Sequence, residues 1–318
     1  MIILVGANGF LGRHSCELLD RRGVQAVAVS RRPDPRFFER FAPSIRSMSV
    51  AEFASSAGAE IIPQARAVVY LAWGSVPTTF HQEPWRELAV NVEPAFQLFL
   101  RIAELAPNAK IVLLSSGGTV YGRDGTEPKA ETSPTEPISS YGLGKLMAEE
   151  ALKLVSRSKG APYAILRVSN AVGRWQANEA QGIIGVALRA AQRGLPVRLY
   201  GGGVQVRDFV DADDVAEAIY AASLDTKHPA ATWNIGSGVG VTISQVLERA
   251  ACVAKRPIAI EHAPARNMDV PHAVLDCHKI EMDLGWVATT PLKDSLHRFW
   301  LAVQHRDGRP LTRIDPQK

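Results

Sequence analysis

The sequence predicts an α/β fold: a doubly wound parallel sheet that carries a smaller, mostly C-terminal lobe. Three observations support this prediction. Short apolar runs alternate along the chain with amphipathic segments of helical period, a pattern typical of parallel strands joined by helical crossovers. The first apolar run, residues 2–5, passes directly into the glycine-rich stretch 6–12, GANGFLG. Beyond residue 168 the order of strands and helices changes, which indicates a second lobe.

The glycine-rich stretch lies between a predicted buried strand and the helix that includes Leu11. Gly6 permits a tight turn, Gly9 lets a phosphate approach bare backbone, and Gly12 lets the helix pack close to the strand. The free N–H groups and dipole of the helix N-terminus favour a pyrophosphate. The spacing is G-x-x-G-x-x-G, not the standard G-x-G-x-x-G, and such glycines could also be only structural. We predict a nucleotide-binding turn of the Rossmann type.

The second predicted strand, residues 24–29, is followed by Ser30, Arg31 and Arg32. A dinucleotide fold that selects NAD places an acid at this position, where it bonds the ribose 2′-hydroxyl. A hydroxyl and two guanidinium groups would instead bind a 2′-phosphate. Solvated arginines in a loop are the alternative interpretation. We therefore expect NADP or NAD as the cofactor, with NADP favoured.

The other elements follow from the same periodicities. Strands are predicted at 67–72, 110–116 and 163–168, with a weak strand near residue 45 in the otherwise less regular stretch 33–63. Helices are predicted at 85–105 and from residue 141 onward. The later part of the chain has predicted helices at 181–193, 215–224, 243–253 and 291–303, and predicted strands at 206–210 and 233–235. We assign residues 1–167 with 204–239 to an NAD(P)-binding Rossmann domain, and residues 168–203 with 240–318 to a substrate-binding lobe.

Tyr141 and Lys145 lie four residues apart on a predicted helix, and hence on one face. A phenol with a reference pKa of about 10 is a poor acid or base at neutral pH, but a nearby ammonium stabilises the phenolate and lowers that pKa. Tyr and Lys occur at this spacing by chance in many helices. In a chain with a predicted dinucleotide turn, and just after a strand that ends in Ser115 and Ser116, the pair becomes a candidate catalytic site.

Eight motifs, in order, resemble those of the extended short-chain dehydrogenase/reductase family. They are GANGFLG (6–12), VVYLAW (68–73), Asn91-Val92, LLSSGGTVYG (113–122), YGLGK (141–145), RVSN (167–170), RDFVDADD (207–214) and WNIGSG (233–238). Within that family the chain is similar to nucleotide-sugar epimerases and dehydratases of the UDP-glucose 4-epimerase type. The resemblance spans nearly the whole chain, and its motifs are specific for the family but not for the substrate.

The resemblance implies a role for each matching residue. Tyr141 becomes the catalytic acid/base, and Lys145 activates it and bonds the nicotinamide ribose. Asn170 would hold the phosphates of a nucleotide sugar, with Arg207 and Arg266 closing on the diphosphate or base; Ser75 is a further substrate-binding candidate. The candidate cofactor-binding residues are Gly6, Asn8, Gly9, Phe10, Leu11, Gly12, Ser30, Arg31, Arg32, Leu71, Ala72, Trp73, Asn91, Ser115, Tyr141, Lys145 and Val168. Asn91 could also be purely structural, and an isolated arginine is usually a surface charge.

One residue departs from the family pattern. Counting back from Val120, the family's catalytic Ser or Thr falls at Gly117, which has no hydroxyl. Thr119 or Ser116 could supply that hydroxyl, since both lie in the same strand-end loop, and Thr119 is our preferred candidate.

Three functions remain open. The first is 4-epimerisation of a UDP-hexose: the base removes the 4-hydroxyl proton as hydride passes to the nicotinamide, and delivery to the opposite face inverts the carbon without net oxidation. The second is NADPH-dependent reduction of a nucleotide-linked 4-keto-6-deoxyhexose, because an enzyme that only cycles hydride has no need of NADPH. The third is a non-catalytic nucleotide-sensing regulator. The intact Tyr141 and Lys145 argue against the third function, whereas Gly117 argues for it.

The composition restricts the kinds of molecule that the chain is expected to bind. The net charge of +4 would suit an anionic ligand, but the basic residues are scattered and form no patch of the kind that binds nucleic acid. No apolar run approaches a membrane span and no signal segment is visible, so we expect a cytoplasmic protein. The eight histidines are dispersed, so no metal is expected. The resemblance implies a homodimer through the helices near Trp85 and Tyr141, whose apolar stripes could equally face only the sheet.

Overall fold

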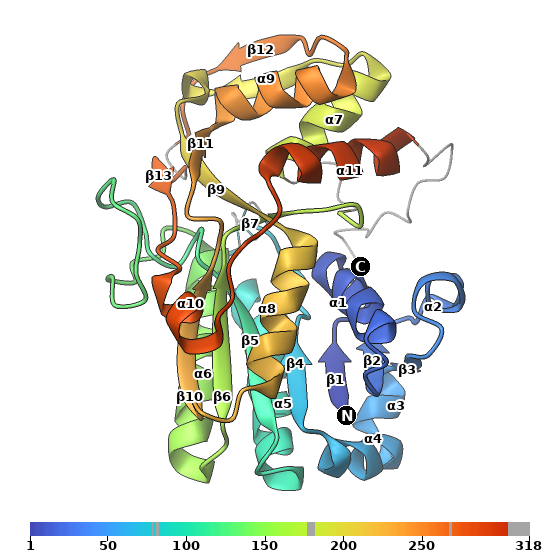
Figure 1. The fold of residues 1–318 in the computed structure, drawn as a ribbon. Coiled ribbons are helices and arrows are strands. Elements are labelled where there is room, and N and C mark those ends of the chain that lie inside the picture. Colours follow the sequence, from blue (N-terminus) through green and yellow to red (C-terminus); the bar gives the residue numbers. More distant parts are fainter. Residues whose placement is uncertain (78, 81–82, 177–181, 267–268, 305–318) are drawn as a thin grey trace.

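The computed structural model describes residues 1–77, 79–80, 83–176, 182–266 and 269–304 of the chain (Figure 1). Its central sheet has seven strands: β1 (Ile2–Val5), β2 (Ala26–Ser30), β3 (Arg46–Ser49), β4 (Ala67–Tyr70), β5 (Lys110–Ser116), β6 (Tyr163–Val168) and β10 (Ala230–Ile235). All of its pairings are parallel, and the order is β10-β6-β5-β4-β1-β2-β3. The prediction of a doubly wound parallel sheet is confirmed. The order reverses between β1 and β4, which is where such sheets bind ligands.

Helices cover both faces of the sheet (Figure 1). One face packs against α1 (Phe10–Arg21), α2 (Pro35–Phe41), α8 (Ala212–Leu224) and α10 (His278–Leu284). The other packs against α3 (Val50–Ala54), α4 (Ser56–Ile61), η1 (Ile62–Gln64), α5 (Glu93–Leu105) and α6 (Ser140–Lys159). The first strand is apolar throughout because it serves both layers: Ile2 and Leu4 belong to the first core, and Ile3 and Val5 to the second.

A second lobe stands over the carboxyl ends of the central strands (Figure 1). Its strands are β7 (Asn170–Val172), β8 (Val197–Tyr200), β9 (Val206–Asp211), β11 (Gly240–Thr242), β12 (Ile260–Ala263) and β13 (His272–Ala273), and its helices are α7 (Ile183–Arg193), η3 (Gly201–Gly203), α9 (Ile243–Ala254) and α11 (Leu292–Gln304). Strand β9 pairs with β7, β11 and β13, although it falls in the segment 204–239 that we assign to the Rossmann domain. The division into two domains stays a prediction.

The stretch 33–63 is more regular than the sequence predicts. Besides β3 it holds α2, α3 and α4, which are only seven, five and six residues long. Caps rather than a repeated apolar period define these helices: Asp34 accepts from the Phe37 N–H, and Ser49 forms a capping box with Glu52. The predicted weak strand near residue 45 is confirmed as β3, whereas the sequence analysis missed these three short helices.

Two predicted helices begin differently from expectation. The helix predicted at 85–105 starts as the π-helical turn η2 (Leu88–Val92) and continues as α5. Residue 181, where the helix 181–193 is predicted to start, lies outside the described residues; within them α7 begins at Ile183.

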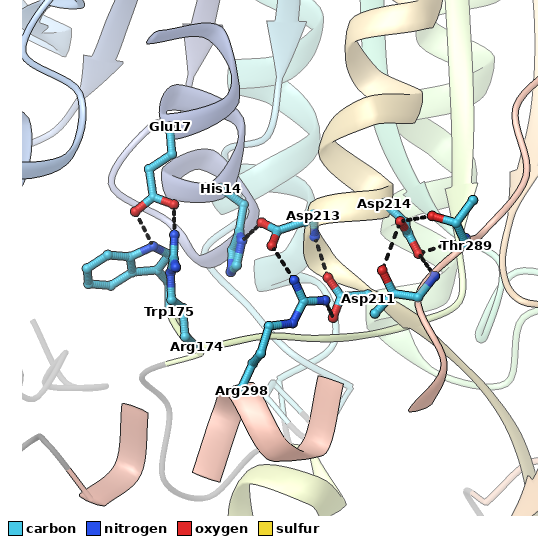
Figure 2. Close-up of polar contacts among 10 residues, drawn as sticks. His14, Glu17, Arg174, Trp175, Asp211, Asp213, Asp214, Thr289 and Arg298 are labelled. Atoms are coloured by element: carbon cyan, nitrogen blue, oxygen red, sulfur yellow. Dashed lines mark hydrogen bonds and ion pairs between the residues drawn. The ribbon is translucent and has the colours of Figure 1, made fainter. Parts of the chain in front are cut away.

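Charged side chains tie the second lobe to the Rossmann half of the chain. Figure 2 shows Arg298, on α11, bound to Asp211 and Asp213 at the start of α8, with N···O distances of 2.7 and 3.0 Å. The other carboxylate oxygen of Asp213 lies 2.6 Å from His14 Nδ1, on α1. Gly173 makes room for this histidine, since a Cβ there would lie 2.7 Å from His14 Nε2. Helix α1 is thus joined through α8 to the second lobe.

Candidate active site

The carboxyl ends of the central strands open onto a cavity of about 870 Å³ that the second lobe also lines. It brings together most of the predicted site residues: Gly6, Gly9, Phe10, Leu11, Gly12, Leu71, Trp73, Ser75, Ser115, Ser116, Thr119, Tyr141, Lys145, Val168, Asn170, Arg207 and Arg266. The predicted residues that do not line it are Asn8, Ser30, Arg31, Arg32, Ala72 and Asn91.

The turn between β1 and α1 is shaped by close approach of the backbone. Gly6 has a φ of +97°, and a Cβ there would lie 2.6 Å from the Ala72 nitrogen, in the chain that leaves β4. A Cβ at Gly12 would lie 2.5 Å from the Gly6 carbonyl oxygen. Helix α1 has no side-chain cap and no acid in its first turn, so its N-terminus faces the cavity with backbone donors only. This arrangement fits a pyrophosphate.

The end of β2 carries a hydroxyl and two guanidinium groups. Ser30 is buried and its Oγ has no hydrogen-bond partner within the described ranges, whereas Arg31 and Arg32 are exposed. The Asn8 side chain donates to the Arg32 carbonyl oxygen, which fixes this segment beside the glycine turn. The next carboxylate along the chain, Asp34, is paired with Arg13 at 2.7 Å.

Tyr141 and Lys145 lie on one face of α6, as predicted, in the first two turns of that helix. The Lys145 ammonium donates to the Leu114 carbonyl oxygen at 2.8 Å and lies 3.8 Å from the centre of the Trp73 ring. Burial lowers the pKa of Lys145 to about 7, while the charges of Glu87 and Glu149 act in the opposite direction. The ammonium is therefore held inside the site by a carbonyl dipole and an aromatic face.

Burial raises the pKa of Tyr141, and the charge of Glu87 raises it further, while a hydrogen bond with the Ser116 side chain lowers it. The sequence predicts that Lys145 lowers the pKa of Tyr141. In this structure the pKa of Tyr141 is raised overall, because desolvation of the phenolate and the nearby carboxylate outweigh the contact that lowers it; the effect of the ammonium stays a prediction. Tyr141 is thus a strong base once it has lost its proton.

The missing hydroxyl at residue 117 has a structural cause. A Cβ at Gly117 would lie 2.5 Å from Leu275 Cδ1 and 2.9 Å from the Arg167 carbonyl oxygen, so the space is filled. Of the two alternatives, the Ser116 side chain is the group that lowers the pKa of Tyr141, and Thr119 lines the cavity with a buried Oγ1 that has no partner in the described part of the chain. Both hydroxyls remain available to the site.

Sequence reasoning missed two buried acids. Glu87, in the turn before η2, is 1% exposed and accepts from Trp73 Nε1 at 2.8 Å and from Ser75 Oγ at 2.7 Å. Asn91 Nδ2 also donates to it, at 2.8 Å, and Asn91 Oδ1 accepts from the Gly74 N–H at 2.6 Å. Asn91 and the Ser75 hydroxyl therefore brace the loop after β4 from behind. No sequence motif marks Glu87, whose partners Trp73 and Ser75 precede it on another element.

The second missed acid, Glu149, is fully buried on α6. Arg167 of β6 binds both of its oxygens, with Nη2 at 2.7 Å, and Ser115 of β5 donates to it as well. The Arg167 guanidinium also donates to the Tyr121 hydroxyl at 3.0 Å. Ser115, predicted to bind the cofactor, thus also anchors helix α6 through Glu149.

The lobe side of the cavity carries the predicted substrate residues. Asn170 Nδ2 donates to the Asp208 carbonyl oxygen at 3.0 Å, and Arg207 donates to the Val270 carbonyl oxygen at 2.6 Å. Arg266 pairs with Asp269 at 2.8 Å and lies 4.1 Å from the Tyr200 ring centre. Two arginines and an amide therefore face the cavity opposite the glycine turn.

The described residues contain neither a metal-binding cluster nor a membrane-spanning helix. Within them, no group of three or more His, Cys, Asp or Glu side chains is arranged to hold a metal ion. Among the same residues, no helix combines the length and apolar content needed to cross a membrane.

Comparison with known proteins gives one family and a set of similar chains. Residues 2–236 match the model of the NAD dependent epimerase/dehydratase family. A dTDP-4-dehydro-6-deoxyglucose reductase of Escherichia coli is 26% identical, covering 95% of this chain and 97% of its own. A UDP-glucose 4-epimerase of Streptococcus mutans is 27% identical, covering 90% and 91%. The structure of a Thermotoga maritima UDP-glucose 4-epimerase with UDP-glucose has a TM-score of 0.83 at 25% identity, covering 96% and 98%.

The packing at Gly117 generates a test. We expect Gly117→Ser to destabilise the fold by about 1–3 kcal/mol, because the added atoms overpack the contact with Leu275. The added hydroxyl should not raise turnover. In a Leu275→Ala background the same substitution should lower the free energy of unfolding by less. Urea unfolding of the wild type, the two single variants and the double variant measures this. Strictly additive losses would show that Leu275 does not fill this space.

Proposed function

The chain belongs to the NAD-dependent epimerase/dehydratase family, and we propose that it is a nucleotide-sugar 4-epimerase whose substrate is a UDP-hexose. One observation carries this proposal. A single cavity joins the glycine turn, the Tyr141–Lys145 pair and the two arginines of the second lobe. The epimerase relatives in sequence and structure support the choice of reaction.

The residues present fit a dinucleotide, since the N-terminus of α1 has no side-chain cap and faces the cavity, and close backbone packing at Gly6 and Gly12 shapes the turn before it. A nicotinamide, when bound, supplies the acceptor and donor of hydride for C4 of the sugar. Tyr141 takes the proton of the 4-hydroxyl and returns it to the same oxygen after the ring has turned its other face. Lys145 balances the charge of the phenolate.

For the hydroxyl that Gly117 lacks we now favour Ser116 over Thr119, because the Ser116 side chain acts to lower the pKa of Tyr141. Thr119, with its unpartnered buried Oγ1, bonds the sugar. On the lobe side Arg207 and Arg266 neutralise the diphosphate, and Asn170 bonds its oxygens. The substrate thus lies between the catalytic helix and the second lobe.

We assign NADP as the preferred cofactor over NAD. The end of β2 offers the buried Ser30 hydroxyl and the exposed Arg31 and Arg32, and the nearby Asp34 carboxylate is already paired with Arg13. A 2′-phosphate would find two cations there, whereas a 2′-hydroxyl would find no free acid among these residues.

The same feature favours a second candidate reaction, the NADPH-dependent reduction of a nucleotide-linked 4-keto-6-deoxyhexose. The E. coli reductase is a relative over nearly the whole chain. The epimerase proposal has the broader support, because an epimerase relative in sequence and an epimerase structure cover the same length. Interconversion of UDP-hexoses without added reductant distinguishes the two reactions from stoichiometric oxidation of NADPH by a 4-ketosugar.

We further propose a homodimer formed through η2, α5 and α6. The apolar stripe of α6 does not face only the sheet: Leu143, Met147 and Leu154 are 50%, 38% and 48% exposed. Leu88 and Val90 of η2 are also exposed, and η2 packs against α6.

The catalytic assignment predicts that Tyr141→Phe lowers the turnover of UDP-galactose by about 10²–10⁴-fold, because the proton acceptor is lost. Binding of the dinucleotide by calorimetry should be retained. Ser116→Ala should lower turnover more than Thr119→Val does, whereas Thr119→Val should mainly raise KM. Turnover that survives Tyr141→Phe would contradict the mechanism.

The cofactor assignment predicts that Arg31→Ala combined with Arg32→Ala weakens NADPH binding by at least about tenfold and leaves NADH binding nearly unchanged, because only NADPH carries the 2′-phosphate. Calorimetric titration of both cofactors measures this. Arg40→Ala, an exposed arginine on α2, is the matched control. Equal losses of affinity for NADPH and NADH would contradict the assignment of NADP as the preferred cofactor.

The dimer predicts a light-scattering mass of twice one chain. Met147→Lys combined with Leu154→Glu should give the mass of a monomer, because the charges would be buried in the interface. Met282→Lys, at a methionine that is 71% exposed on α10, is the control that leaves the mass unchanged. A wild-type monomer would overturn the proposal.

A further inference from the structure

A buried acid lies directly behind the catalytic pair. The Glu87 carboxylate, on a residue that is 1% exposed, accepts from three neutral side-chain donors: Trp73 Nε1 at 2.8 Å, Ser75 Oγ at 2.7 and 2.8 Å, and Asn91 Nδ2 at 2.8 Å. Neutral donors hold a carboxylate in place without cancelling its charge. The negative charge therefore acts on whatever ionisable groups lie next to it.

Helix α6 is shaped around this acid. A Cβ at Gly144 would lie 2.4 Å from Glu87 Cγ and 3.1 Å from Glu87 Oε1. Gly144 directly precedes Lys145 and follows Tyr141 by three residues, so the acid packs against the backbone turn that presents both. Any larger residue at 144 would displace it.

The Trp73 indole connects this acid to the ammonium. Its edge donates to Glu87, and its face lies 3.8 Å from Lys145 Nζ. The same ring meets the Tyr141 ring edge to face, with centroids 6.3 Å apart. Trp73 lines the cavity, so one side chain forms a wall of the site and orients both catalytic residues.

The negative charge of Glu87 also acts on both residues of the catalytic pair. The charge of Glu87 raises the pKa of Lys145 against the effect of burial, and it also raises the pKa of Tyr141. The other acid that acts on Lys145 is Glu149, whose charge is already paired with Arg167. Glu87 therefore supplies the counter-charge that burial of the ammonium requires.

We propose that Glu87 is a positioning residue of the reaction: it fixes the Trp73 ring against the Lys145 ammonium and serves as the buried counter-charge of that ammonium. The inference rests on the proposed function for its effect on turnover, but its structural content stands apart from the substrate. Glu87 acts through Trp73, Lys145 and Tyr141 and need not touch the sugar.

The sign of the effect follows from the charge. Glu87→Gln keeps an oxygen that accepts from Trp73 but removes the negative charge, so both Lys145 and Tyr141 lose their protons at lower pH. The pH profile of kcat in the proposed epimerisation should move as a whole to lower pH, by on the order of one unit. KM should change little. Glu93→Gln, an exposed acid at the start of α5, is the matched control and should leave the profile in place.

A second measurement needs no substrate. The fluorescence of Trp73, taken as the difference between wild type and Trp73→Phe, should change as Lys145 titrates near pH 7. Lys145→Met should abolish this transition, and Glu87→Gln should move its midpoint to lower pH. An unchanged midpoint overturns the inference. If the wild type turns over no UDP-hexose, the proposed function fails, and the midpoint still decides the role of Glu87.

If Glu87→Gln does not fold, the contact with Gly144 provides another test. Gly144→Ala should lower the Tm of the wild type by several degrees, since the added methyl displaces the acid. In a Glu87→Ala background, where Cγ is absent, the same substitution should cost much less. If the decreases in Tm caused by the two substitutions simply add, Glu87 does not pack against the catalytic helix.

Discussion

The site depends first on the buried contact between Glu149 and Arg167. This pair joins helix α6 to strand β6 of the central sheet, with Ser115 of β5 as a third partner. Removing two charges from water is costly, and only near-complete hydrogen bonding offsets that cost. Both oxygens of Glu149 are bonded, and the guanidinium also donates to Tyr121. In return, the register of α6 on the sheet is fixed, and with it the height of Tyr141 and Lys145 above the strand ends.

The sequence predicted what local patterns can encode. The glycine turn, the central strands and the Tyr141–Lys145 spacing each depend on residues within a few positions of one another. Glu87 escaped prediction because its partner Trp73 and the Gly144 backbone lie on other elements, and an acid in a helical segment normally indicates solvent. The helices between 33 and 63 escaped because caps define them rather than periodicity. The effect of burial on Tyr141 also needed the fold, since sequence spacing reveals the cation but not the desolvation.

At two positions of the site, a side chain from another element fills the space beside a glycine. Leu275 fills the place of a side chain at Gly117, while the adjacent Ser116 lowers the pKa of Tyr141. Glu87 occupies the space left by Gly144 and holds Trp73 in the cavity wall. In both cases, one in the strand-end loop and one in helix α6, the space that a side chain at the glycine would need is occupied by a group from another element. The effect of substituting such a glycine can therefore be interpreted only together with a substitution of the side chain packed against it.

The ion pairs that join Arg298, Asp213 and His14 place helix α1 in contact with two parts of the molecule, the nucleotide turn and the second lobe. Its N-terminus belongs to the nucleotide turn, while its flank is linked through α8 to α11 of the second lobe. An element shared between two ligand sites provides a route by which their binding free energies are coupled, and such coupling is reciprocal: any preference of the nucleotide for one lobe position is returned, in equal measure, as a preference of that lobe position for the nucleotide. The affinity for the nucleotide and the affinity for the ligand of the second lobe then change by the same free energy when the other partner binds.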